Sequence, residues 1–166
     1  MRVGLLTVSD RSARGEREDA SGPALAAYLR DHGWPVERTA VVSDDQTGIE
    51  AQLVTWSADH LDLILTTGGT GFSPRDHAPE ATTAVCDRMA PGLGEAMRRA
   101  GAEKTAHAML SRAVAGIRGR TLIVNLPGSP TAALESLAAI LPALEHGLRL
   151  LRDEPGVEAG HRTENR

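Results

Sequence analysis

Four short apolar runs limit what this chain can fold into. They are Val3–Val8, Val36–Val42, Leu61–Thr66 and Thr121–Leu126. Three of them are continuous, without the polar residue at every second position that marks a strand with one face in water. Such continuous runs are typical of strands that helices cover on both faces. The run Val36–Val42 is half polar, which indicates a strand nearer the edge of the sheet.

Segments with helical character separate these runs. A capping residue and an early proline in Ser21-Gly22-Pro23 precede the first of them. We expect helices at Ala24–His32, from Asp45 or Thr47 to about Asp59, at Pro79–Arg88, at Leu93–Ala100 and at Thr131–Leu151. The last segment carries leucines three and four residues apart, a stripe that we expect to pack on the sheet, with an oligomer contact as the alternative. Pro142 should kink this helix or split it in two.

Strands that alternate with helices predict an α/β fold with a mostly parallel sheet, covered by helices on both faces. The expected architecture is a three-layer single domain spanning residues 1–152. Residues 153–166 are polar and have almost nothing apolar to bury. We therefore expect them to form a mobile tail.

Composition disfavours several classes of function. Only four residues are aromatic, too few for a base-stacking surface, and the net charge of −4 disfavours binding to duplexes, so we expect no nucleic-acid partner. The single cysteine, Cys86, excludes an internal disulfide, and we expect it to be buried in a helix. No apolar run approaches the ~18 residues of a membrane helix. The N-terminal run is too short for a signal peptide, and we expect a soluble, cytoplasmic protein with no membrane partner.

The loop after the third apolar run is the most informative one, because ligands of open α/β sheets bind beyond the carboxyl ends of the strands. Here Gly68, Gly69 and Gly71 surround Thr70, so the backbone can turn tightly and aim its amides inward. This composition predicts a phosphate-binding loop, whereas a purely structural turn would need fewer glycines. Asp76 follows closely and could hold a metal against the bound phosphates.

Two common nucleotide-binding motifs do not fit this loop. A Walker loop needs Gly-Lys followed by Ser or Thr, but the only lysine of the chain, Lys104, follows Glu103. The dinucleotide fingerprint needs a last glycine where Pro74 stands.

The other three loops carry polar residues that suit a site but also suit ordinary turns. Ser9-Asp10-Arg11-Ser12 follows the first run, and a turn with a capping Asp or Ser is its alternative. Ser43-Asp44-Asp45 follows the second run, and its carboxylates could hold a divalent cation or cap the next helix. After the fourth run comes Asn125, and then Pro127-Gly128-Ser129-Pro130, which could face a ligand or form a plain capped turn.

One segment is strongly basic. Between Arg98 and Arg120, six cationic residues stand against Glu103 alone, a local net charge of +5. A solvated face is one explanation, and an anionic ligand or partner is the other. The pair Ser111-Arg112 is the part of this segment best suited to bind a phosphate or an acidic ring system.

The motifs occur together in a specific order. They are Thr7-Val8-Ser9-Asp10-Arg11, Thr67-Gly68-Gly69-Thr70-Gly71 with Arg75-Asp76, Met109-Leu110-Ser111-Arg112 and Leu126-Pro127-Gly128-Ser129-Pro130. In this combination the chain resembles the MogA/MoaB family of molybdenum-cofactor biosynthesis proteins, which includes the G domain of gephyrin. The resemblance runs from about Arg2 to about Arg152 and implies a molybdopterin-binding domain over residues 1–152.

The resemblance implies an adenylyltransferase that uses Mg²⁺ and takes ATP and molybdopterin as substrates. AMP would pass to the terminal phosphate of the pterin, giving adenylyl-molybdopterin and pyrophosphate. The main obstacle to this reaction is repulsion between two anionic phosphates. Metal and hydrogen-bond donors would have to neutralise that charge.

The resemblance also assigns residues to roles. Asp44 and Asp76 would be catalytic and bind the metal, although Asp45 adjoins Asp44 and Ser43 stands where the family usually has proline. Ser111, with Arg112 beside it, would contact the pterin. The residues implied for the nucleotide are Gly68, Gly69, Thr70, Gly71, Asn125, Pro127, Gly128 and Ser129, and the opening motif adds Ser9 and Asp10 without a firm role for either.

The resemblance further implies a homo-oligomer, with a trimer favoured and hexamers in the other branch of the family, and a hand-over of product to a molybdenum-insertion protein. Two alternative functions remain open. One is a carrier that binds molybdopterin without transferring AMP. The other is a scaffold that binds a protein partner.

Overall fold

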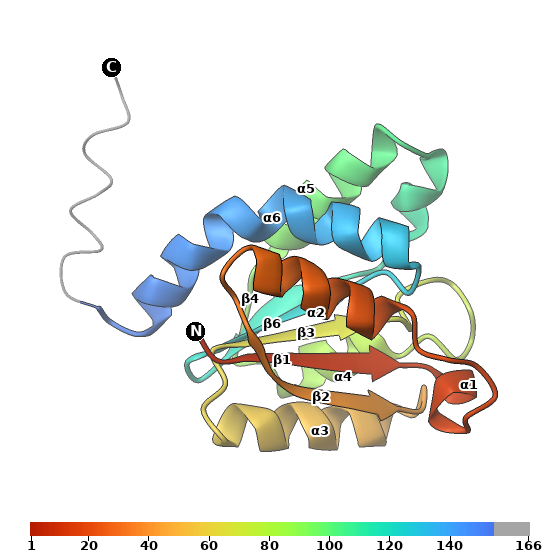
Figure 1. The fold of residues 1–166 in the computed structure, drawn as a ribbon, viewed down its shortest axis with the longest axis horizontal. Helices are drawn as coiled ribbons and strands as arrows, with labels where there is room; N and C mark the ends of the chain where they lie inside the picture. Colours follow the sequence, from red (N-terminus) through yellow and green to blue (C-terminus); the bar gives the residue numbers. More distant parts are fainter. Residues whose placement is uncertain (155–166) are drawn as a thin grey trace.

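A six-stranded sheet in the order β2-β1-β3-β6-β5-β4 forms the middle of the molecule (Figure 1). The structure is a computed structural model and describes residues 1–154. The parallel strands are β1 (Val3–Val8), β2 (Val36–Val42), β3 (Leu63–Thr67) and β6 (Thr121–Leu126). Each corresponds to one of the four predicted runs, and β2 lies at an edge, as its polar pattern indicated.

Two strands complete the sheet that the sequence did not predict. They are β4 (Arg88–Met89) and β5 (Ala115–Arg118), which pair antiparallel, and β5 also pairs antiparallel with β6. The turn between β5 and β6 contains Gly119, whose φ of +57° suits a glycine. The sheet is therefore mostly parallel, with an antiparallel extension at one edge.

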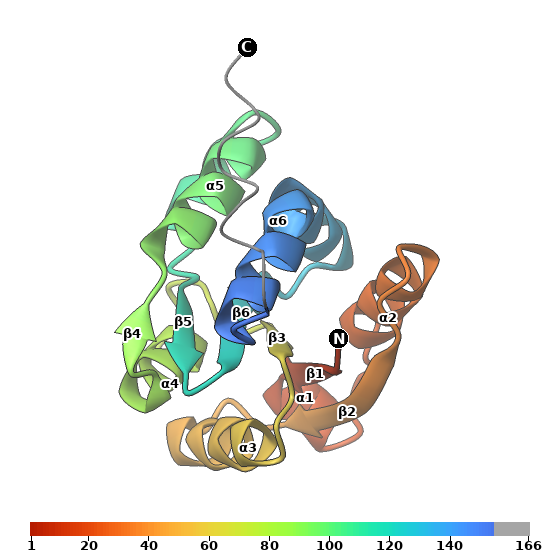
Figure 2. The ribbon, with the colours of Figure 1, turned by 90° about the vertical axis from the view of Figure 1, so that its left-hand side faces the viewer.

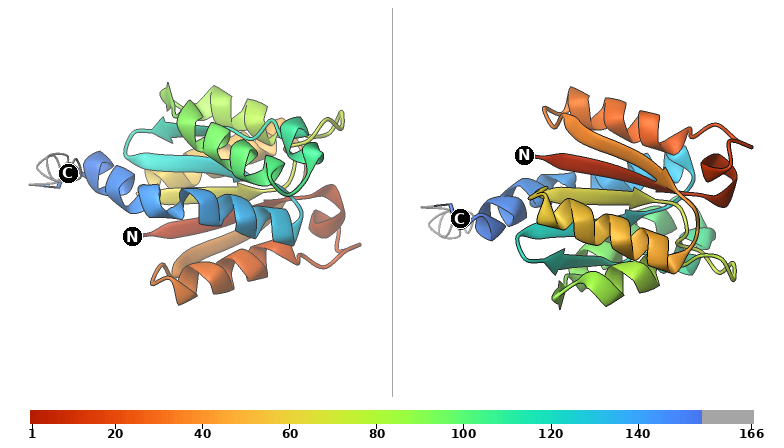
Figure 3. Two further views of the ribbon diagram at one scale, coloured as in Figure 1. Left: turned by 90° about the horizontal axis from the view of Figure 1, so that it is seen from above. Right: turned by 90° about the horizontal axis from the view of Figure 1, so that it is seen from below.

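Helices cover both faces of the sheet. Their bounds are α1 (Asp10–Ala13), α2 (Ser21–Asp31), α3 (Gln46–Ala58), α4 (Ala78–Val85), α5 (Pro91–Ala102), the 3-10 helix η1 (Ala106–Leu110) and α6 (Pro130–Leu151). Figure 2 shows α2, α5 and α6 on one face and α3 and α4 on the other. Figure 3 shows the same two faces separately, from above and from below. The predicted three-layer α/β architecture is thus confirmed.

The continuous apolar runs are explained by two hydrophobic clusters, one on each face of the sheet. Leu5 of β1 belongs to the cluster that Leu137 of α6 also joins. The next residue, Leu6, belongs to the cluster of Ile49 and Trp56 on the other face. Because successive side chains of a strand point to opposite faces, a strand covered on both sides must be apolar at every position.

The apolar stripe of α6 packs on the sheet, as predicted. Leu137, Leu144 and Leu148 are buried in one cluster with the strands. The alternative that Pro142 splits the helix is wrong, since α6 continues through it as one element. A proline inside a helix costs about 3 kcal/mol. Burial of leucines on both sides of Pro142 offsets this cost.

Several predicted helix ends need correction. Ser21 is not a cap but the first residue of α2, and the Asp19 carboxylate accepts hydrogen bonds from the amides of Ser21 and Gly22 instead. Helix α4 ends at Val85, because Arg88 pairs with β5 in the sheet. The 3-10 helix η1 was not predicted, because its residues have no apolar periodicity.

An ion pair holds the C-terminal end of α6 against the rest of the domain. Arg152 forms an ion pair with Asp62, which precedes β3. Most of the tail predicted at residues 153–166 lies outside the described residues, and its mobility stays a prediction. Within residues 1–154, no helix combines the length and apolar character needed to cross a membrane.

Candidate functional site

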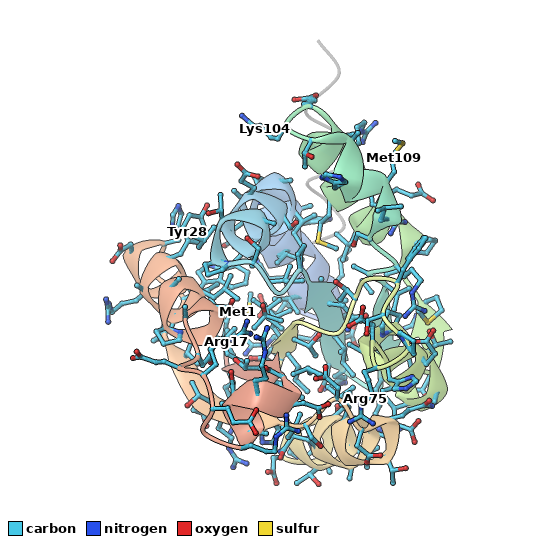
Figure 4. All side chains as sticks on the ribbon, turned by 90° about the vertical axis from the view of Figure 1, so that its right-hand side faces the viewer. Met1, Arg17, Tyr28, Arg75, Lys104 and Met109 are labelled. Carbon is cyan, nitrogen blue, oxygen red and sulfur yellow. The ribbon has the colours of Figure 1, made fainter. Side chains whose placement is uncertain are left out.

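The carboxyl ends of β1, β3 and β6 meet at one edge of the sheet, which Figure 4 views directly. From β1 the chain passes to β2 on one side and then returns to β3 on the other side. Such a switch point opens a crevice between the two neighbouring strands. A cleft of about 700 Å³ lies there, and we call it the main cleft. Its lining includes Ser9, Asp44, Gly68, Gly69, Gly128 and Ser129.

The glycine loop, residues 68–71, has a backbone that only glycine can supply. Gly68 has a φ of +100°, and a Cβ at this position would lie 2.2 Å from the carbonyl oxygen of Val8. Gly69 follows with a φ of +62°. Within residues 1–154, the amides of Gly69, Thr70 and Gly71 donate no hydrogen bond. Free amides on a turn of positive φ are suited to binding an anion, as the sequence predicted.

The loop after β6 packs directly against the glycine loop. A Cβ on Gly128 would lie 3.2 Å from the Cα of Gly68, so the two backbones touch. The Thr67 hydroxyl donates to the Pro127 carbonyl at 2.7 Å and fixes this approach. Ser129 precedes α6 without making a side-chain capping bond, so the N-terminus of this long helix adjoins the main cleft. Helix N-termini favour negative charge.

Asp10 and Asp44 are joined by two hydrogen bonds, in which the amide of each residue donates to the carboxylate of the other. The Asp10 amide donates to Asp44 Oδ2 at 2.6 Å, and the Asp44 amide donates to Asp10 Oδ1 at 3.0 Å. Arg75 adds two hydrogen bonds to the Asp10 carboxylate. The hydrogen bonds from the Arg75 side chain, and then the bond from the Asp44 amide, lower the pKa of the Asp10 carboxyl below its ordinary value. Ser9 caps the short helix α1 through its bond from the Ser12 amide.

The structure separates the roles of the two neighbouring carboxylates Asp44 and Asp45. Asp45 caps α3, where its carboxylate accepts from the Gly48 amide at 2.8 Å. Asp44 lines the main cleft, and its Oδ1 lies 3.4 Å from the position of a Cβ on Gly69. Of the two alternatives left by the sequence, helix capping belongs to Asp45, and Asp44 faces the cleft.

Asp76 lies at the other end of the glycine loop. Its Oδ2 accepts from the Ser73 amide at 2.9 Å and lies 2.9 Å from the position of a Cβ on Gly71. It borders a shallow recess with Phe72 and His77, outside the main cleft. Within residues 1–154, no group of three His, Cys, Asp or Glu side chains is arranged to hold a metal ion. Asp76 is therefore not part of a ready-made cluster of metal ligands among these residues.

Arg112 holds the glycine loop in place through hydrogen bonds. Its amide donates to the Thr70 carbonyl at 2.9 Å, its Nε to the Gly71 carbonyl at 2.7 Å, and its Nη2 to the Asp76 carbonyl at 2.6 Å. Its remaining terminal nitrogen pairs with Glu80. The sequence predicted Arg112 as a ligand contact. In the structure these donors hold the backbone that carries Asp76, and the ligand contact stays a prediction.

A second recess, of about 260 Å³, lies on the other side of the glycine loop. Thr70 and Gly71 line it together with Ser111 and Pro127, and most of the surface exposed in it is apolar, with contributions from Met97 and Leu110, although Arg98, Thr105, His107, Glu135 and Ser136 also line it. The Arg98 guanidinium also borders it and donates to the Ala113 carbonyl at 2.8 Å. Residues 67–69 and 128–130 line the main cleft, and residues 70, 71 and 127 line the second recess, so the two hollows lie on either side of the same two loops.

Asn125 does not face either hollow. It is 0% exposed, and its Nδ2 donates to the hydroxyls of Thr66 and Thr82. Its Oδ1 accepts from the Val114 amide at 3.3 Å. Both hydrogens of Nδ2 are used in these bonds, and in this structure the buried side chain of Asn125 joins β3, α4 and the residue before β5. The structure therefore shows a structural role for Asn125, and the nucleotide contact that the resemblance implied stays a prediction.

Cys86 is unsuited to nucleophilic chemistry. It lies directly after α4, partly buried. Burial, and then the negative charge of Asp87, raise the pKa of its thiol to about 11. The thiol is therefore protonated at neutral pH.

Comparisons with known proteins show the family of this chain. A sequence profile described as "Probable molybdopterin binding domain" matches residues 4–146. The chain belongs to this family. Among family members, the molybdopterin adenylyltransferase of Helicobacter pylori J99 is 41% identical over 152 residues, which cover 90% of this chain and 86% of that protein.

Two further family members show the range of the similarity. A crystal structure of the molybdopterin biosynthesis enzyme MoaB from Thermus thermophilus matches with a TM-score of 0.88 and 52% identity, covering 93% of this chain and 98% of that one. Gephyrin of Dictyostelium discoideum is 40% identical over 163 residues, but the match spans only 23% of gephyrin. The family resemblance inferred from the motifs is thus confirmed.

Proposed function

We propose that this protein transfers AMP from ATP to molybdopterin and releases pyrophosphate, as a step of molybdenum-cofactor biosynthesis. The observation that carries this proposal is that the glycine loop and the loop after β6 each line both the main cleft and the second recess. Two different substrates can occupy neighbouring hollows there, with their phosphates side by side. Bacterial relatives that are molybdopterin adenylyltransferases, about 41% identical to this chain, support the same reaction.

The reaction needs two anions to approach each other. An oxygen of the pterin's terminal phosphate attacks the α-phosphorus of ATP, and the bond to pyrophosphate breaks. The free amides of Gly69 and Thr70 can donate hydrogen bonds to these phosphates. The loop need not rearrange for this, because its conformation already leaves both amides unpaired. Arg112 keeps those amides in place.

Asp44 and Asp76 fit Mg²⁺ that arrives with the nucleotide. Mg²⁺ in nucleotide sites is held by one or two carboxylates plus substrate phosphates. Asp44 lies beside Gly69 in the main cleft and Asp76 lies beside Gly71 in the neighbouring recess, so each would offer one carboxylate to Mg²⁺ bound with the phosphates, whereas a cage of protein ligands alone is not built among the described residues. Bound Mg²⁺ would offset the negative charge of the phosphates.

The remaining site residues divide between the two substrates in this proposal. Ser111 and the apolar lining of the second recess would hold the pterin. Ser9, Asp10 and the loop Pro127–Pro130 would border the nucleotide in the main cleft.

The proposed surroundings of the protein follow the family resemblance. We propose a homo-oligomer, a trimer rather than a hexamer, that hands its product to a molybdenum-insertion protein in the cytoplasm. Size-exclusion chromatography with light scattering measures the oligomer directly.

The test is AMP transfer by the purified protein. With molybdopterin, Mg²⁺ and ATP labelled at the α-phosphate, we expect labelled adenylyl-molybdopterin and an equal amount of pyrophosphate. Asp76→Ala should abolish transfer while molybdopterin still binds. If the wild type binds molybdopterin but consumes no ATP, the protein is a carrier and the proposal is wrong.

A matched pair of variants tests the cleft carboxylate. Asp44→Asn should lose transfer, because Asp44 faces the cleft. Asp45→Asn should keep it, because asparagine also caps a helix well. Equal activity of Asp44→Asn and the wild type would remove Asp44 from the proposed metal site.

A further inference from the structure

Two arginines of the segment between β1 and α2 border the main cleft. Arg11 and Arg17 line it along with Gly68, Gly69 and Ser129. In Figure 4 the side chain of Arg17 lies in front of the strand ends, beside α1. Neither arginine lines the second recess. Both are thus placed to meet the ligand of the main cleft alone.

These two guanidinium groups differ from the other arginines around them. Arg14, on the same segment, pairs with Glu16 at 2.7 Å, and Arg75 pairs with Asp10 at 2.9 Å. By contrast, Arg11 and Arg17 form no side-chain hydrogen bond or ion pair within residues 1–154. Both side chains are exposed and keep all their donors available.

Four acidic residues also line the main cleft, namely Asp10, Glu18, Asp19 and Asp44, and within residues 1–154 none of them forms a hydrogen bond or ion pair with the side chain of Arg11 or Arg17. The Asp10 carboxylate is held by Arg75. The Asp19 carboxylate accepts from the Thr7 hydroxyl at 2.6 Å and from two amides at the start of α2. Lys104 is remote from the cleft, at the tip beyond α5 (Figure 4). A polyphosphate in the cleft therefore meets Arg11 and Arg17 as its unpaired cations.

We infer that Arg11 and Arg17 bind the β- and γ-phosphates of a nucleoside triphosphate and make the main cleft prefer a triphosphate over a monophosphate. This inference rests on the proposed function, which puts the α-phosphorus at the glycine loop between the two hollows. The two arginines border only the main cleft, so they contact the part of the polyphosphate that leaves as pyrophosphate. Guanidinium groups suit this task because they bind phosphate oxygens with two parallel hydrogen bonds.

The test compares affinities for ATP and AMP by isothermal titration calorimetry with Mg²⁺ present. The double variant Arg11→Gln/Arg17→Gln removes both charges. It should bind ATP about tenfold or more weakly than the wild type. Its affinity for AMP should change less than about twofold, because AMP lacks both outer phosphates. The control Arg14→Gln removes one charge from the same segment outside the cleft and should bind both nucleotides as the wild type does.

Each outcome decides the inference. Equal ATP affinity in the double variant and the wild type would overturn it, and so would an equal loss for ATP and AMP, which would place the arginines on the nucleoside. Circular dichroism and the melting temperature show whether the variants are folded. If the wild type binds ATP through these arginines but transfers no AMP, the proposed function fails while the inference stands. If transfer proceeds with an unchanged KM for ATP in the double variant, the inference fails and the function stands.

Discussion

Arg75 holds both oxygens of the Asp10 carboxylate, with its Nη2 2.9 Å from Oδ1 and its Nε 3.0 Å from Oδ2. Asp10 lies after β1 and Arg75 lies in the loop after β3, so the pair joins two loops that are 65 residues apart in the chain. Asp10 in turn exchanges hydrogen bonds with Asp44. Arg75 therefore connects the proposed metal ligand Asp44 with its own neighbour Asp76.

The ion pair of Asp10 and Arg75 should make stability depend on pH. The pKa of Asp10 is below its ordinary value of 3.8 in the folded protein, so the pair stabilises the fold above that pH. The contribution is lost as the pH falls through the folded-state pKa. We expect Asp10→Asn to lower the melting temperature at pH 7 and to match the wild type more closely at a pH below the folded-state pKa of Asp10. A difference of the same size at both pH values would contradict the assigned pairing.

Gly68→Ala should destabilise the protein strongly. A Cβ at this position would lie 2.2 Å from the Val8 carbonyl oxygen, and φ is +100°. We expect a loss of roughly 2–4 kcal/mol in the free energy of unfolding, measured with urea. Gly119→Ala is the matched control, since its φ is also positive but its Cβ would meet no atom within 4 Å. It should lose only about 1–2 kcal/mol, and equal losses would show that the clash at Gly68 is relieved.

Asn125→Ala should lower stability through the core of the fold. It removes the partner of the Thr66 and Thr82 hydroxyls and of the Val114 amide, which are left without hydrogen bonds. We expect a loss of about 2–4 kcal/mol by urea unfolding. Ser129→Ala, whose side chain makes no capping bond, is the comparison and should change little. A variant of Asn125 with wild-type stability and weaker nucleotide binding would restore the contact role that the sequence implied.

Arg112→Lys should loosen the glycine loop. Lysine keeps the charge but cannot reproduce the hydrogen bonds to the Gly71 and Asp76 carbonyls together with the pairing to Glu80. We expect faster hydrogen exchange at residues 69–78 than in the wild type, with the exchange of β1 unchanged. Unchanged exchange at residues 69–78 would show that other contacts hold the loop.

The four parallel strands could be predicted from the sequence alone. Val3–Val8 and Thr121–Leu126 match β1 and β6 at both ends, because continuous apolar runs must be buried on both faces. The antiparallel strands β4 and β5 were missed. Arg88–Met89 has only two residues and no pattern of its own, and it becomes a strand only because β5 supplies its hydrogen bonds.

The candidate site shows the same division. The glycine loop was predicted from residue types alone, since its positive φ values require glycine at Gly68 and Gly69. The distinction between Asp44 and Asp45, the burial of Asn125 and the pinning role of Arg112 were decided by tertiary structure. Each depends on partners distant in the chain, such as Asp10, Thr66 and the loop after β3. A local pattern reports which backbone and burial a residue needs, but only the packed fold decides which neighbours use its hydrogen-bonding groups.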